Sequence, residues 1–224
     1  MIPLSDDQHT RTRPFGTLLL IAINAYVFIA WQEQVGVDHS VALAGFVPMD
    51  YANKVPGAAT RMITSMFMHG GWMHLIGNMW FLWVFGKTVE DACGFFRYLA
   101  FYILSGAAAT LAYGFFLPDT SVPLVGASGA ISGVLGAYLL RNPGARIATL
   151  MPFGIFTRIM AVPAWFFLLV WIGIQIISQL GESHAAGQET GGVAYLAHIG
   201  GFVAGMGLIF FFEKPDRGER RRPR

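Results

Sequence analysis

Long apolar runs constrain the fold of this 224-residue chain more than any other feature of its sequence. Crossing the hydrocarbon core of a bilayer as an α-helix takes about 20 apolar residues. Six apolar segments can be traced, at roughly Phe15–Trp31, Trp72–Gly86, Phe95–Leu117, Gly126–Leu140, Met160–Leu180 and Val193–Phe212. We therefore predict an all-α membrane protein in which residues 15–212 form a bundle of six transmembrane helices.

Composition excludes an ordinary soluble domain. Only 12% of the residues are charged, whereas soluble domains carry about 25%. The second and fourth segments are short for a span, so we expect them inside the bundle, where a short helix is shielded from lipid. The first segment follows Arg11 and Arg13 and could alternatively be a signal peptide. Its length, and the large residues at Trp31–Gln34, argue against cleavage there.

The positions of lysine and arginine predict the orientation of the bundle. If the N-terminus is cytoplasmic, six spans return the C-terminus to the same side, which then carries 13 of the 15 basic residues. The other two, Lys54 and Arg61, fall on the opposite side. This bias follows the positive-inside rule. We therefore expect residues 1–14 and the basic tail, 213–224, in the cytoplasm, and the compact organisation suggests a bacterial inner (plasma) membrane.

Four polar side chains within the apolar segments are candidates for function, because polar groups at membrane depth are costly. They are His74 and Asn78 in the second segment, Ser128 in the fourth and His198 in the sixth. Counted from the basic residue that follows each segment, His74, Ser128 and His198 lie roughly 20 to 24 Å above the cytoplasmic side. Three helices thus bring polar groups to one level, where a serine and a histidine supply a nucleophile and its general base.

Each candidate also has a purely structural interpretation. Ser128 could be a helix N-cap or a small packing residue. His198 could instead hydrogen-bond across helices to hold the bundle together. Glycines at helical spacing predict close helix contacts between the fourth and sixth segments; they are Gly126, Gly129, Gly201 and Gly205.

Taken together, these motifs resemble those of the rhomboid intramembrane serine proteases. Gly126-x-Ser128-Gly129 is similar to the nucleophile motif of that family, and His74-x-x-x-Asn78 to its helix-two pair. Ala197-His198 followed by Gly201-x-x-x-Gly205 is similar to its sixth helix. The resemblance extends over about Arg61–Phe212, in the order the family has.

The resemblance implies a catalytic dyad of Ser128 and His198, with oxyanion contacts from His74, Asn78 and the backbone N–H of Ser128. It implies an intramembrane endopeptidase that cleaves single-span membrane proteins in or near their transmembrane segment through an acyl-enzyme. The implied partners are these substrates and the lipid bilayer, with no nucleic acid, cofactor or metal. Residues 181–192 would cap the site, and the fifth segment would be its lateral gate.

Two departures from the family pattern accompany this resemblance. In some members an aromatic residue four positions after the serine packs on the histidine, and here that position is Ser132. The Trp-Arg pair that some members carry in the first outer loop is also missing.

Three other classes of protein stay open. A metal site is disfavoured because His69 and His74 are five residues apart with no Glu between them, unlike H-E-x-x-H. Glycine-interrupted short helices also occur in transporters, but no carboxylate lies within an apolar segment. An inactive family member would bind membrane clients without cleaving them, but such proteins usually lack the serine or the histidine.

Overall fold

The fold is a helical membrane bundle, as predicted. The computed structural model describes residues 1–153, 156–184 and 194–215. Among them, four helical stretches are long and apolar enough to cross a membrane: Phe15–Val35, Phe95–Phe116, Ala164–Gly181 and Tyr195–Phe212. They correspond to the four segments whose length predicted a span. The chain is therefore a multi-pass integral membrane protein, and the count of six crossings stays a prediction.

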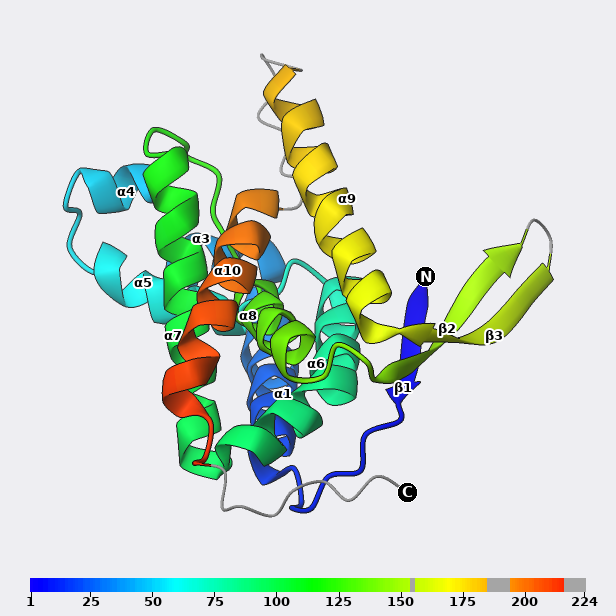
Figure 1. Ribbon diagram of the computed structural model, residues 1–224. Coiled ribbons are helices and arrows are strands. Elements are labelled where there is room, and N and C mark those ends of the chain that lie inside the picture. The colour runs from blue at the N-terminus through cyan, green and yellow to red at the C-terminus, as the bar shows by residue number, and fades with distance from the viewer. Residues whose placement is uncertain (154–155, 185–193, 216–224) are drawn as a thin grey trace.

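The long helices surround one short central helix (Figure 1). The first span is built from α1 (Phe15–Val27), a π-helical turn η1 (Phe28–Gln32) and α2 (Glu33–Val35). The segment between the first span and the next long helix contains α3 (Val37–Ala44), α4 (Pro48–Ala52), α5 (Ala58–Thr64) and the 3₁₀ turn η2 (Ser65–Phe67). The remaining helices are α6 (Trp72–Cys93), α7 (Phe95–Phe116), α8 (Ser128–Arg141), α9 (Ala164–His184) and α10 (Tyr195–Phe212).

Helix α8 lies at the centre of this arrangement. It contacts α6, α7, α9 and α10, and its residues from Gly129 to Tyr138 are all buried. With 14 residues it is shorter than a bilayer is thick. Its neighbours shield it from lipid, as we expected for the fourth segment.

Helix α6 is longer than predicted, since it continues beyond Gly86 to Cys93 and has 22 residues. The polar extension is stabilised by Glu90, whose carboxylate accepts hydrogen bonds from the backbone N–H groups of Gly16 and Thr17 at 2.7 and 2.8 Å. These N–H groups lie at the start of α1, where a helix leaves its donors without intrahelical partners. The apolar segment predicted at Trp72–Gly86 therefore lies within a longer helix that ends in polar residues.

A three-stranded antiparallel sheet, which the apolar pattern did not reveal, joins the bundle at the base of α9 (Figure 1). Its strands, in spatial order, are β1 (Ile2–Asp6), β2 (Arg146–Phe153) and β3 (Phe156–Pro163). Residues 160–163 thus belong to a strand, although we predicted them to be the start of the fifth segment. Helix α9 begins directly after Pro163, and the backbone N–H groups of Ala164 and Trp165 donate to the carbonyl oxygens of Ala145 and Pro143 at 2.8 and 3.1 Å.

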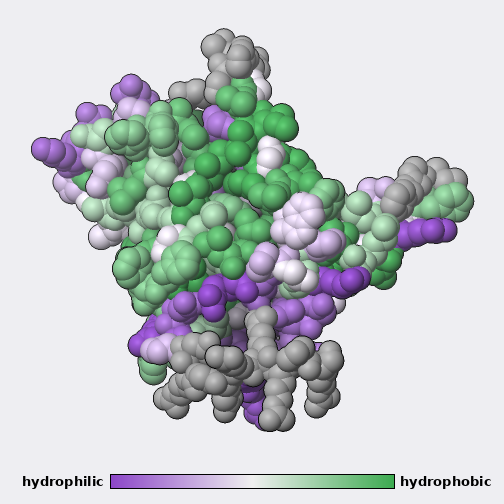
Figure 2. Space-filling model, viewed as in Figure 1, coloured by the Kyte–Doolittle hydropathy of each residue, from purple (hydrophilic) through white to green (hydrophobic). Residues whose placement is uncertain are grey.

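The loop predicted at residues 181–192 is only partly visible. Residues 181–184 continue α9, and the rest of the predicted cap lies outside the described residues. The basic tail is described only to residue 215, where Glu213 forms an ion pair with Arg141 at 2.9 Å. Figure 2 shows apolar side chains over the middle of the bundle and hydrophilic ones gathered where α10 ends and around α4 and α5.

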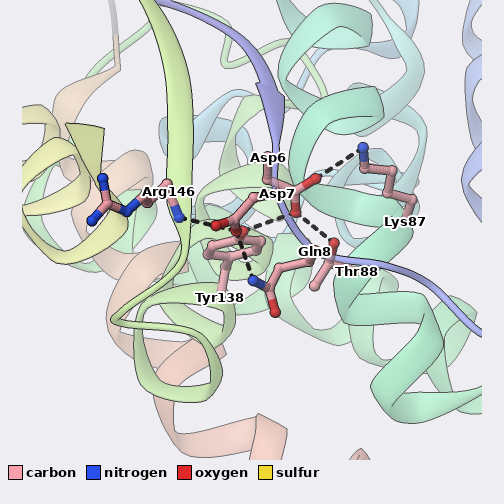
Figure 3. Close-up of polar contacts among 7 residues, drawn as sticks. All are labelled: Asp6, Asp7, Gln8, Lys87, Thr88, Tyr138 and Arg146. Atoms are coloured by element: carbon pink, nitrogen blue, oxygen red, sulfur yellow. Dashed lines mark hydrogen bonds and ion pairs between the residues drawn. The ribbon is translucent and has the colours of Figure 1, made fainter. Parts of the chain in front are cut away.

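A buried carboxylate attaches the N-terminal strand to the bundle (Figure 3). The Asp6 side chain is fully buried and pairs with Lys87 of α6 at 2.9 Å. Its other oxygen accepts hydrogen bonds from Thr88 at 2.7 Å and from Tyr138 of α8 at 2.8 Å. Strand β1 therefore connects two helices to the sheet that leads into α9.

Replacing Asp6 with Asn is expected to lower the free energy of unfolding by about 3 kcal/mol, because removing one partner of a buried ion pair leaves the other uncompensated. Thermal unfolding in detergent micelles measures this loss. Asp7→Asn is the matched control, since Asp7 is exposed and accepts from the backbone N–H of Arg146. Equal losses in the two variants would contradict the role of Asp6.

Candidate active site

Glycine residues bring α8 and α10 into backbone contact. A Cβ atom added at Gly201 would lie 2.1 Å from the carbonyl oxygen of Gly129, and one added at Gly205 would lie 2.0 Å from that of Gly133. Only glycine fits at such distances, as the spacing of these residues predicted. This contact places the first turn of α8 beside the first two turns of α10.

Gly126 does not share this packing role, which corrects our prediction. It precedes α8 and has a φ of +117°, a conformation that favours glycine. A Cβ atom there would lie 2.8 Å from the ring of His74 rather than against a helix backbone. Gly126 therefore leaves room beside the site instead of bringing two helices together.

Ser128 and His198 meet across the α8–α10 contact. The Oγ atom of Ser128 lies 2.8 Å from Nε2 of His198, within hydrogen-bond distance. His198 is 8% exposed and Ser128 is half-buried. The two residues are 70 positions apart in the chain and were paired in the sequence analysis only by their estimated depth and the family resemblance.

Helix α9 contributes two side chains that the sequence analysis missed. Oε1 of Gln175 lies 2.7 Å from Nδ1 of His198. The indole of Trp171 lies against the His198 ring, with centroids 5.9 Å apart and an angle of 36° between the planes. An amide in the middle of an apolar segment is costly to bury unpaired, and this signal was available in the sequence for Gln175.

Trp171 also accounts for the departure at Ser132. An aromatic ring packs on the histidine here, but it comes from α9 rather than from the position four residues after the serine. The hydroxyl of Ser132 instead donates to the backbone oxygen of Ser128, one turn earlier in α8, at 2.7 Å.

His74 and Asn78 converge on the space beside Gly126. A Cβ atom at Gly126 would lie 2.8 Å from Nε2 of His74 and 3.5 Å from Nδ2 of Asn78. The backbone N–H of Gly70 donates to Nδ1 of His74 at 3.3 Å. Since Nδ1 accepts, the neutral ring carries its proton on Nε2, which faces this space. Two side-chain N–H donors, one from His74 and one from Asn78, are thus directed at the space beside Gly126.

Nδ2 of Asn78 is buried and has no hydrogen-bond partner among the described residues. Buried polar groups are normally paired, so an unpaired donor calls for an explanation. The unpaired donor would be explained if a bound ligand supplied the hydrogen-bond acceptor. The Ser128 backbone N–H belongs to the first turn of α8, where donors have no intrahelical partner.

The segment before α6 is held by Gln32, a further residue that the sequence analysis did not select. The Gln32 amide accepts from the backbone N–H of His69 at 2.9 Å and donates to its carbonyl oxygen at 3.1 Å. Gln32 is the last residue of the π-helical turn η1 and is fully buried. This double contact fixes the backbone from which Gly70 orients His74.

A small cavity lies next to the serine. Residues of η2, α7, α8 and α10 line it, among them Ser65, Thr110, Gly126, Ser128 and Ala197. In the part of the chain that the structure describes, no three His, Cys, Asp or Glu residues are grouped closely enough to hold a metal ion.

Fold and site together define a helical membrane protein that encloses a serine–histidine pair within its bundle. Comparison with known proteins assigns the family, since residues 56–215 match the family model described as the Rhomboid domain. The chain belongs to the rhomboid family.

Relatives within this family differ in length and in activity. The chain is 27% identical over 214 residues to "Rhomboid-like protein 11, chloroplastic" of Arabidopsis thaliana, covering 93% of this chain and 69% of the relative. It is 30% identical over 194 residues to "Rhomboid protease GluP" of Bacillus subtilis, covering 87% and 34%. It is 28% identical over 162 residues to "Inactive rhomboid protein 1" of Danio rerio, covering 71% and 16%.

These relatives limit what membership alone implies. The family includes proteases and inactive proteins, so activity has to be argued from the site. Its members also include chloroplastic and bacterial proteins, and the comparisons therefore do not support a bacterial membrane in particular. The chain spans about a third or less of the length of two of these relatives.

Proposed function

We propose that this protein is an intramembrane serine endopeptidase that cleaves single-span membrane proteins in or near their transmembrane segment. The observation that carries the proposal is the 2.8 Å contact between the Ser128 hydroxyl and Nε2 of His198. A nucleophile and base within hydrogen-bond reach, with the base oriented by a third group, is the arrangement that activates serine.

The chemistry would proceed in two steps. Oγ of Ser128 attacks the scissile carbonyl carbon while its proton moves to Nε2 of His198, and a tetrahedral oxyanion forms. The C–N bond then breaks, the leaving amine takes the proton from His198, and an acyl-enzyme remains on Ser128. A water molecule deprotonated by His198 hydrolyses this ester and regenerates the serine.

The developing oxyanion would lie in the space beside Gly126. Nε2–H of His74 and the unpaired Nδ2–H of Asn78 are directed there, and the backbone N–H of Ser128 lies at the start of α8. Donors fixed in advance at the place where charge develops stabilise the transition state more than the ground state.

His74→Ala and Asn78→Ala are each expected to lower kcat by roughly 10- to 1000-fold, because each removes one oxyanion donor. The Michaelis constant should change little, since a donor used only in the transition state does not bind the substrate's ground state. Steady-state cleavage of a single-span reporter measures both constants. Met73→Ala is the control, because Met73 lies on the same helix and is 81% exposed. An unchanged kcat in both donor variants would assign His74 and Asn78 to packing.

The proposed function is tested by reconstituting the purified protein in liposomes with a single-span reporter protein. Mass spectrometry of the products should find new termini in or near the transmembrane segment of the reporter, and Ser128→Ala should leave the reporter intact. Binding of the reporter without cleavage would instead identify an inactive family member. Cleavage that persists in Ser128→Ala would contradict the proposed chemistry.

We further propose that both termini face the cytoplasm, so that the site opens toward the outer side. This orientation rests on the positive-inside rule applied to the basic residues. The basic residue Arg141 and the ion-pair partner Glu213 meet where α8 and α10 end, at the side assigned to the cytoplasm. The proposed orientation is tested by measuring whether the C-terminal tail is protected from added protease in sealed vesicles of known sidedness.

A further inference from the structure

His198 can act as a base toward Ser128 only in one of its two neutral tautomers. A neutral imidazole carries a proton on one nitrogen and a lone pair on the other. The lone pair must be on Nε2, which faces the Ser128 hydroxyl, so the proton must be on Nδ1. Whatever contacts Nδ1 therefore decides whether the pair is ready to react.

The group that contacts Nδ1 is an oxygen of Gln175. Oε1 of Gln175 lies 2.7 Å from Nδ1, and a carbonyl oxygen can only accept a hydrogen bond. The contact therefore requires a proton on Nδ1 and leaves Nε2 free to accept from Ser128. Both Gln175 and His198 are 8% exposed, so little water competes for this hydrogen bond.

Trp171 fixes the same ring from its face. It lies four residues before Gln175, so both side chains leave α9 on the same side. Its indole lies against His198 and stacks on Phe202, one turn further along α10, at 6.1 Å and 28°. The hydrogen bond sets the rotation of the imidazole in its plane, and the indole limits the tilt of that plane.

Helix α9 is nevertheless the least enclosed of the candidate spans. In its apolar window 22% of the residues are buried, compared with 33% to 39% in the other three. It contacts the bundle through α8, α10 and the two strands at its base, and it stands at the edge of the bundle in Figure 1. The candidate span with the smallest buried share thus supplies both contacts that orient His198.

We propose that Gln175 is a positioning residue that holds His198 in the reactive tautomer, so that the catalytic site is complete only while α9 is docked against α10. This inference rests on the proposed function, because it assigns Gln175 a part in the activation of Ser128. Gln175 acts through His198 and does not touch the reacting atoms.

Two substitutions at Gln175 separate positioning from simple packing. Gln175→Met keeps the length of the side chain but removes the amide oxygen, and Gln175→Glu keeps an oxygen acceptor whether or not the carboxyl group is ionised. In liposomes with the single-span reporter, Gln175→Met should lower kcat by about 10- to 100-fold, while the Michaelis constant stays within about 2-fold. Gln175→Glu should recover most of the lost kcat. Gln175→Leu provides a second apolar variant if the methionine variant does not fold.

The outcomes distinguish this inference from the function on which it rests. If the wild type and Gln175→Met have equal kcat, or if Gln175→Glu is as slow as Gln175→Met, the positioning role is wrong while the protease function stands. A fall in thermal stability that parallels the fall in kcat across all variants would reduce Gln175 to packing and also overturn the role. A wild type that does not cleave the reporter would contradict the proposed function itself, and the positioning role with it.

Discussion

Ser128→Ala and His198→Ala are each expected to lower the rate of reporter cleavage by about 10⁴- to 10⁶-fold, and the double variant should be no slower than either single variant. The reason is that the hydroxyl and the imidazole act as one unit through their 2.8 Å contact. Without the serine the imidazole has no nucleophile to activate, and without the imidazole the serine has no general base. Single-turnover cleavage in liposomes measures these rates.

Ser132→Ala is the matched control for this comparison. It removes a hydroxyl from the same helix, one turn further along, whose hydrogen bond stays within α8. We expect its rate to stay close to that of the wild type, because such bonds to the preceding turn add little stability. If Ser128→Ala retained a tenth of the wild-type rate, or if the two single losses simply multiplied in the double variant, the dyad would be contradicted.

Gly205→Ala is expected to damage both the stability and the activity of the protein. The added Cβ would lie 2.0 Å from the carbonyl oxygen of Gly133, so α8 and α10 must separate by about 1.5 Å to restore an ordinary contact. Because the substitution forces this packed contact apart, it should lower the free energy of unfolding by about 3 kcal/mol. Because Ser128 and His198 lie on these two helices, the same shift should lower kcat by about 100-fold.

The control for this substitution lies two residues further along the same helix. A Cβ atom at Gly207 would meet nothing within 4 Å. Gly207→Ala should therefore keep full activity. Its free energy of unfolding should rise by up to about 1 kcal/mol, since alanine favours a helix more than glycine does. Thermal unfolding in micelles and reporter cleavage check both variants. Equal behaviour of the two would refute the close α8–α10 contact.

Helical parts of the fold were predictable because they depend on local composition. Long apolar runs correctly predicted the four candidate spans, and the short segment at α8 was correctly expected inside the bundle. The sheet was not predictable in this way, because β2 and β3 are partly apolar and β3 merges with the apolar run of α9. Residues 2–6 pair with residues 146–153, which are far away in the chain, and a local sequence pattern does not predict such a pairing.

Half of the site could be predicted from its residues and half could not. Ser128, His198, His74 and Asn78 stand out because each is polar in an apolar or glycine-rich setting, and the structure brings all four to one region. Gln175 satisfies the same criterion and was overlooked, since an isolated glutamine matches no motif. Gln32 stands beside Glu33 and Gln34 and therefore does not stand out. The contact between Trp171 and His198 depends on how α9 packs, which the sequence alone does not specify.

The central claim of this account is that His198 activates Ser128 across the α8–α10 contact. The most direct measurement is the rate at which a fluorophosphonate modifies the protein, with the adduct located by mass spectrometry. We expect one adduct, on Ser128, and a rate of modification about 10²- to 10⁴-fold lower in His198→Ala, in which the serine is still present. An adduct on a different serine, or an equal rate of modification in wild type and His198→Ala, would contradict it.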